Sequence, residues 1–298
     1  MQETISKNTK NYKVESKTSP MISEEEKEGK LVERGCLGRI DKKAYQKNIE
    51  RELYSYYIKK IDQDLDDYFN DYLDQNPKND PYSFLLEIQK ENPARLEQLK
   101  TIKQKVKKTM DERVRGERLR FLKEFEIEDQ FKIVEESQGE DFEPSEPKTK
   151  FAYDLHATIA ENLDLEDFED LEYYTAVNTH LDNCGVDAFF KFKNKSEQGE
   201  KQPIRVCFDI TTNTPEEKRN QEIDKRRAGE KILTDLVLFL TNEELETIKE
   251  LYTNRNRREE KNDARFQKMR KEYDFILNDF SNKIINQYQK RRYYGEGG

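Results

Sequence analysis

The stretch "GVDAFFKFKNKSEQGEKQPIRVCFDITTN", residues 185–213, predicts a β-hairpin. Two runs alternate between apolar and polar residues on either side of a polar middle, as half-buried strands do. One face of the predicted hairpin carries only apolar side chains: Val186, Ala188, Phe190 and Phe192 on the first strand, and Ile204, Val206, Phe208 and Ile210 on the second. Each strand carries one aspartate on its other face, Asp187 on the first and Asp209 on the second.

The register of this hairpin places the two aspartates opposite one another. The polar loop "NKSEQGEKQP" centres near Gln198, so a symmetric antiparallel hairpin pairs residues whose numbers sum to about 396. Cβ atoms of directly opposed residues lie roughly 5 Å apart, and like charges there repel. A Mg²⁺ ion, which takes oxygen ligands, would relieve this repulsion, and Thr211 offers a hydroxyl on the same face. The alternative is an ordinary pair of solvated aspartates on an exposed sheet face.

The segments around the hairpin predict an α/β unit from Phe151 to Asn242. A helix to about Asn162 comes first, followed by a mixed segment, the hairpin and a charged helix from Pro215 to about Lys231. The next run, Ile232 to Leu240, is almost continuously apolar, which is typical of a strand buried on both faces.

This unit resembles the PD-(D/E)XK nuclease superfamily, which has a restriction-endonuclease-like core of a mixed sheet flanked by helices. "GVD" at Gly185 to Asp187 is similar to its first motif element, and "FDITT" at Phe208 to Thr212 is similar to its second. The resemblance implies that Asp187 and Asp209 bind Mg²⁺ or Mn²⁺ together with the backbone carbonyl of Ile210. It also implies a glutamate on the first helix, for which Glu161 is the best candidate, while Glu166, Glu169 and Glu172 compete.

Two residues depart from the motif of this superfamily. Val186 stands in place of a proline, and Thr211 stands in place of the lysine that orients the attacking water. Family members with such a substitution can recruit a lysine from the next helix, where Lys218 and Lys225 are available. Lysines on a solvated helix face are the alternative interpretation of these two residues.

Composition predicts four further regions around the α/β unit. Residues 1–40 lack hydrophobic periodicity and predict a disordered tail, and residues 41–134 predict a helical region. Residues 135–150 are acidic and contain two prolines, which predicts a linker. Residues 243–298 predict a C-terminal helical arm.

The overall composition excludes several classes of protein. Only 33% of residues are hydrophobic and no run approaches the length of a membrane span, so we expect a cytoplasmic protein without membrane contact. Three widely spaced cysteines form neither a disulfide framework nor a zinc motif, and two histidines leave little material for histidine-based catalysis.

The distribution of charge favours nucleic acid as a partner despite a net charge of −9. Residues 95–124 carry eleven Lys/Arg against five Asp/Glu, and residues 254–298 carry twelve against seven. These helical arms are expected to contact phosphates, and they offer a route to a homodimer. The sequence therefore predicts a Mg²⁺- or Mn²⁺-dependent nuclease acting on DNA more than RNA through Asp187, Asp209, Thr211 and Lys218. The alternative is a catalytically inactive scaffold or interaction protein with a nuclease-like domain.

Overall fold

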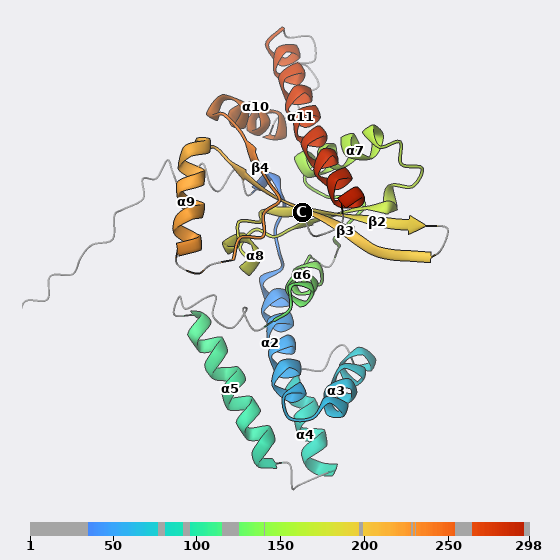
Figure 1. The fold of residues 1–298 in the computed structure, drawn as a ribbon, viewed down its shortest axis with the longest axis vertical. Coiled ribbons are helices and arrows are strands. Elements are labelled where there is room, and N and C mark those ends of the chain that lie inside the picture. The colour runs from blue at the N-terminus through green and yellow to red at the C-terminus, as the bar shows by residue number, and fades with distance from the viewer. Residues whose placement is uncertain are drawn as a thin grey trace, which may run out of the picture.

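The computed structural model describes a mixed α/β protein in which a four-stranded sheet is flanked by helices (Figure 1). It describes residues 35–76, 81–91, 96–114, 125–139, 141–196, 199–227, 229, 231–253 and 264–294. The predicted disordered tail falls mostly on residues 1–34, outside this set. Within the described part of the chain, no helix is both long and apolar enough to cross a membrane.

The helical region lies on one side of the sheet and has its own apolar packing. Its helices are α2 (Lys42–Lys59), α3 (Gln63–Gln75), α4 (Pro81–Glu91), α5 (Leu96–Val114) and α6 (Ile127–Glu135). Helix α2 begins where Asp41 accepts hydrogen bonds from the backbone N–H groups of Lys43 and Ala44, which is the role of an N-cap. Apolar side chains at helical spacing are buried along both helices, including Ile49, Leu53 and Ile58 on α2 and Leu65 and Phe69 on α3.

The sheet has the strand order β1-β2-β3-β4. Its strands are β1 (Leu171–Thr175), β2 (Ala188–Ser196), β3 (Gly199–Thr211) and β4 (Leu236–Phe239). The pairs β1–β2 and β2–β3 are antiparallel, and β3–β4 is parallel. The crossover from β3 to β4 contains α9 (Pro215–Arg227), as a parallel connection requires.

Helices cover both faces of this sheet (Figure 1). On one face, α7 (Lys150–Asn162), α10 (Asn242–Thr253) and α11 (Ala264–Tyr294) enclose the apolar face that the sequence predicted. Val186 is the exception, because it precedes β2 and packs in the apolar cluster on the other face. On the other face, α6 places Phe131 with its ring 5.0 Å from that of Phe189. A short helix, α8 (His180–Asn183), joins β1 to the Asp187 segment.

The predicted register of the hairpin is confirmed near the aspartates, while its predicted loop is wrong. Ala188 pairs with Phe208 and Phe190 with Val206, so the residue numbers sum as expected. Beyond Phe192 a register irregularity lets the strands continue to Ser196 and Gly199, through the stretch predicted as a loop. This irregularity is a β-bulge, in which one strand has one more residue than the other between two neighbouring pairs.

The last strand differs from the prediction of a fully buried strand. β4 spans four residues instead of the whole run Ile232 to Leu240, and only Leu238 among the four is buried. The strand order explains this, because β4 stands at one end of the sheet and pairs with β3. Its apolar side chains are therefore covered mainly from the α7 and α11 face.

The predicted linker of residues 135–150 is packed along the sheet. The backbone N–H of Tyr173 in β1 donates to the carbonyl of Pro144, and the side-chain amide of Gln138 donates to the carbonyl of Thr175. Residues 35–40, predicted as part of the tail, also belong to the core, since Leu37 is buried. Hydrogen bonds to β1 hold residues 135–150, and the Tyr173 hydroxyl of β1 donates to the carbonyl of Leu37, contacts that hydropathy does not reveal.

Helix α11 is a core element, so the prediction of a C-terminal arm is wrong for residues 264–294. Its apolar stripe lies within the main hydrophobic core, with Phe280 and Ile284 almost completely buried. Near its end, Arg291 donates to the carbonyl of Arg205 and forms an ion pair with Asp235. A stripe of this length requires a partner surface, which the sheet provides.

Candidate functional site

The two aspartates lie where β2 begins and β3 approaches its end. Asp187 directly precedes β2; its backbone N–H donates to the carbonyl of Phe208 at 2.9 Å. Its carboxylate accepts a hydrogen bond of 2.9 Å from the backbone N–H of Ile210. Asp209 follows Phe208 in β3 and is 8% exposed. The alternative of two solvated aspartates on an open sheet face therefore does not describe this pair.

Burial and mutual repulsion disfavour negative charge on the pair. Burial is the largest cause that raises the pKa of Asp187, the charge of Asp209 is the next, and the result is a pKa of about 7. Burial also raises the pKa of Asp209, against the opposing effect of Lys218. The predicted direct pairing of Asp187 with Asp209 is not part of the ladder, which begins at Ala188 and Phe208, although the charge of Asp209 acts on Asp187.

Lys218 of α9 is the cation that the structure brings to this pair. Its ammonium nitrogen lies 2.7 Å from Asp209 Oδ2, and both side chains are only 11% exposed. Helix α9 begins directly after the turn that follows β3, where Thr214 and Glu217 form reciprocal capping hydrogen bonds. Lys218 is therefore part of a buried ion pair and not of a solvated helix face.

Thr211 and Ile210, the other candidates on β3, have backbone roles in this structure. The hydroxyl of Thr211 accepts a hydrogen bond of 3.2 Å from the backbone N–H of Asn213, in the turn that leads to α9. Ile210 donates its N–H to Asp187 and pairs with Leu238 of β4. Thr211 thus helps to form the turn that positions Lys218.

Two further charged residues act on the pair, Asp182, which the sequence analysis did not identify, and Lys225, which it named beside Lys218. The charge of Asp182 in α8 raises the pKa of both Asp187 and Asp209, so a third carboxylate acts on the site. Lys225 of α9 donates from its ammonium group to the carbonyl of Asn183 at 3.1 Å. Asp182 was missed in the sequence analysis because its position near the two aspartates depends on the turn through α8. Lys225 could be predicted, because it follows Lys218 at helical spacing on α9.

The structure does not bring Glu161 to the aspartates, which corrects the expectation of a first-helix ligand. The start of α7 is the end of this helix that lies towards the aspartates. Thr149 there lies near Gly38 and Thr175, and Thr175 pairs with Ala188, the residue after Asp187. Glu161 is exposed and lies twelve positions further along α7, about 18 Å at the rise of an α-helix. Of its competitors, Glu172 instead forms ion pairs with Lys191 and Lys193.

The residues of the pair suit a divalent cation with oxygen ligands. Mg²⁺ is commonly held by one or two carboxylates and completes its shell with waters and substrate phosphates. Asp209 supplies a buried carboxylate and Asp187 a partly buried one, and such an ion would relieve the repulsion between them. Among the residues that the structure describes, no three His, Cys, Asp or Glu side chains are grouped to hold a metal. An ion here would therefore depend on water and substrate for its other ligands.

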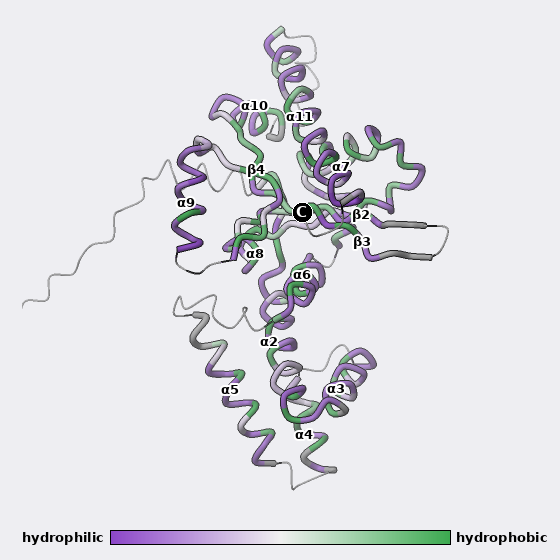
Figure 2. Tube along the Cα trace, viewed as in Figure 1, coloured by the Kyte–Doolittle hydropathy of each residue, from purple (hydrophilic) through white to green (hydrophobic). Residues whose placement is uncertain are grey.

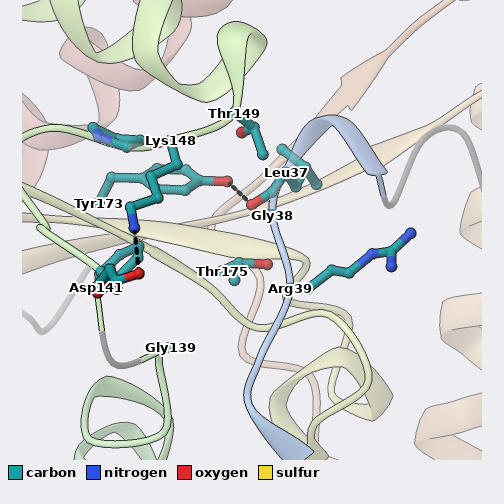
Figure 3. Close-up of a pocket in the computed structure, with 11 residues that line it drawn as sticks. Leu37, Gly38, Arg39, Gly139, Asp141, Lys148, Thr149, Tyr173 and Thr175 are labelled. Carbon is teal, nitrogen blue, oxygen red and sulfur yellow. Dashed lines mark hydrogen bonds and ion pairs between the residues drawn. The ribbon is translucent and has the colours of Figure 1, made fainter.

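A cavity of about 240 Å³ adjoins the site at the end of β1 (Figure 3). Its lining includes Gly38, Lys148 and Tyr173, and the Tyr173 hydroxyl donates to the carbonyl of Leu37 at 2.8 Å. Burial and then the charge of Asp187 raise the pKa of Tyr173 well above its ordinary value. Thr175 also lines the cavity, and the next residue, Ala176, donates its backbone N–H to the carbonyl of Asp187 at 2.8 Å. Lys148 faces Asp141 across the cavity at 3.4 Å.

Comparison of the chain with protein-family models, with curated proteins and with solved structures found no match. The functional argument therefore depends on the geometry of the site.

Proposed function

We propose that this protein is a metal-dependent nuclease that hydrolyses phosphodiester bonds of nucleic acid, with DNA as its principal substrate. The observation that carries the proposal is the buried group formed by Asp187, Asp209 and Lys218. Removing two repelling carboxylates and one lysine from water lowers the stability of the protein. Groups whose pKa is perturbed in this way cluster at binding and catalytic sites.

The order of elements supports the same proposal. A helix, an antiparallel three-stranded meander, a crossover helix and a parallel fourth strand make up the core that the resemblance to PD-(D/E)XK nucleases implies. In that arrangement the two motif aspartates occupy the positions of Asp187 and Asp209. The proposal therefore assigns a restriction-endonuclease-like core to residues 150–239.

Each residue of the group has a defined role in the proposed reaction. Asp187 and Asp209 hold Mg²⁺ or Mn²⁺, which polarises the phosphate and lowers the pKa of a bound water. Lys218 replaces the lysine missing at position 211, and its positive charge stabilises the negative charge that develops on the phosphate oxygens. Hydrogen bonding by Thr211 shapes the turn from which α9 presents Lys218.

The test is cleavage of plasmid DNA, single-stranded DNA and RNA in the presence of Mg²⁺ or Mn²⁺. We expect the wild-type protein to cleave at least one DNA substrate, and Asp209→Asn to lower the rate by about a hundredfold or more. Asp154→Asn is the matched control, because Asp154 is also a partly buried acid paired with a lysine, but on α7.

Two results would overturn the proposal. The wild-type protein could be inactive on every substrate with either ion, or Asp209→Asn could be as active as the wild type. An inactive protein that nevertheless binds nucleic acid would favour the alternative of a scaffold without catalysis.

A further inference from the structure

Helix α9 presents a second lysine on the same face as Lys218. Lys218 and Lys225 are seven positions apart, two turns of an α-helix, so they project from one side about 10 Å apart along the axis. Both side chains are partly buried, whereas the neighbouring Arg219 and Arg226 are exposed. Figure 1 shows α9 at the periphery of the molecule.

Lys225 retains the capacity to bind an anion while it contacts the protein. Its ammonium group has three N–H donors, and one of them bonds to the neutral carbonyl of Asn183. By contrast, Arg227 at the end of α9 is paired with Asp224 at 3.5 Å.

The separation of the two lysines determines what Lys225 can contact. Lys225 is anchored about 10 Å further along α9 than Lys218, so its position suits a phosphate beyond the one bound at Asp187, Asp209 and Lys218. Phosphates of one nucleic-acid strand repeat about every 3.4 Å along the duplex axis, so about 10 Å corresponds to about three phosphates along the same strand. Most of α9 is hydrophilic, as Figure 2 shows, which suits a phosphate backbone.

We propose that Lys225 binds a second phosphate of the substrate strand, a few phosphates along from the one that is cleaved. This inference rests on the proposed function and narrows it. The substrate is a polynucleotide with several consecutive phosphates, and a single phosphodiester without neighbouring phosphates does not engage Lys225. Lys225 is thus a specificity-determining residue.

The experiment compares two substrates that differ in the number of phosphates. One is a single-stranded DNA oligonucleotide, and the other is bis(4-nitrophenyl) phosphate, which has one phosphodiester group. Lys225→Gln removes the charge and keeps an N–H donor for the carbonyl of Asn183, Lys225→Arg keeps the charge, and Arg226→Gln removes an adjacent exposed charge as the control.

We expect Lys225→Gln to raise the KM for the oligonucleotide about tenfold, as the loss of one charge-assisted hydrogen bond does, with kcat unchanged. The slope of log affinity against log salt should fall by roughly 0.7, the value for one phosphate contact on a single strand. Hydrolysis of bis(4-nitrophenyl) phosphate should stay at the wild-type rate. Lys225→Arg should restore the KM, and Arg226→Gln should affect neither substrate.

Three results would overturn this inference while leaving the nuclease proposal intact. Lys225→Gln could slow both substrates equally, it could slow neither, or Arg226→Gln could raise the KM for the oligonucleotide as much. A wild-type protein that hydrolyses neither substrate would instead remove the proposed function, and this inference with it.

Discussion

The ion pair between Lys218 and Asp209 is the single-residue feature with the largest consequences for this fold. Its two charges are almost completely removed from solvent, next to a second carboxylate at Asp187. A buried carboxylate that loses its cation is left uncompensated, so removal of Lys218 should destabilise the protein as well as inactivate the proposed site.

We expect Lys218→Met to lower the free energy of unfolding by about 3–5 kcal/mol, the cost of breaking a buried pair from one side. Lys283→Met is the control, because Lys283 forms a similar pair with Asp279 whose side chains are 45% and 42% exposed. That control should cost less than about 1 kcal/mol. Urea denaturation of both variants gives the comparison, and equal costs would show that the Lys218 pair is solvated.

Glu52 of α2 gives a prediction at the same scale that is independent of the site. Burial raises its pKa from the ordinary value of 4.5 to about 7; Lys132 opposes this rise, and the charges of Asp129 and Glu136 add to it. Below about pH 4 the group is protonated in both the folded and the unfolded protein. Between the ordinary pKa of 4.5 and the folded pKa of about 7, the unfolded protein ionises Glu52 while the folded protein keeps it protonated. The free energy of unfolding therefore falls as pH rises through this interval.

Glu52→Gln should therefore stabilise the protein at about pH 8 by a few kcal/mol and leave stability unchanged near pH 4. Glu97→Gln, at an exposed site on α5, should have no such pH dependence. Melting temperatures across this pH range measure the effect. A stability difference for Glu52→Gln that does not change with pH would contradict the assigned burial of the carboxyl group.

At the scale of elements, α11 shows how a surface prediction can fail. Its sequence is locally basic and its apolar stripe was interpreted as part of an arm, yet that stripe packs on α7 and the sheet. Phe275 and Phe280 lie on the same helix, but Phe275 is 69% exposed whereas Phe280 is 1% exposed. Substitution of these two phenylalanines therefore distinguishes a helix packed in the core from a free arm.

Phe280→Ala should lower the free energy of unfolding by about 3–5 kcal/mol, because it removes a large side chain from the core. Phe275→Ala should change it by no more than about 0.5 kcal/mol. Guanidinium denaturation of the two variants measures the difference. Small effects of both substitutions would support the free arm that the sequence suggested.

At the scale of the whole molecule, local patterns predicted the hairpin register near the aspartates and the order of the elements. Alternation of side chains fixes which residues share a strand face, and helical spacing fixes which lysines of α9 face the site. The packing of residues 135–150 and α11, and the distance of Glu161 from the pair, depend on contacts between distant segments. Such contacts leave no periodic signal in the sequence, so these expectations failed.

The central claim is that Asp187 and Asp209 together hold one divalent cation, and calorimetric titration of the metal-free protein with Mn²⁺ tests it most directly. We predict that the wild type and Asp154→Asn bind Mn²⁺ alike, while Asp187→Asn and Asp209→Asn each lose this binding because one of the two protein carboxylates is gone. Unchanged binding by both site variants, or no binding by the wild type, would contradict the claim.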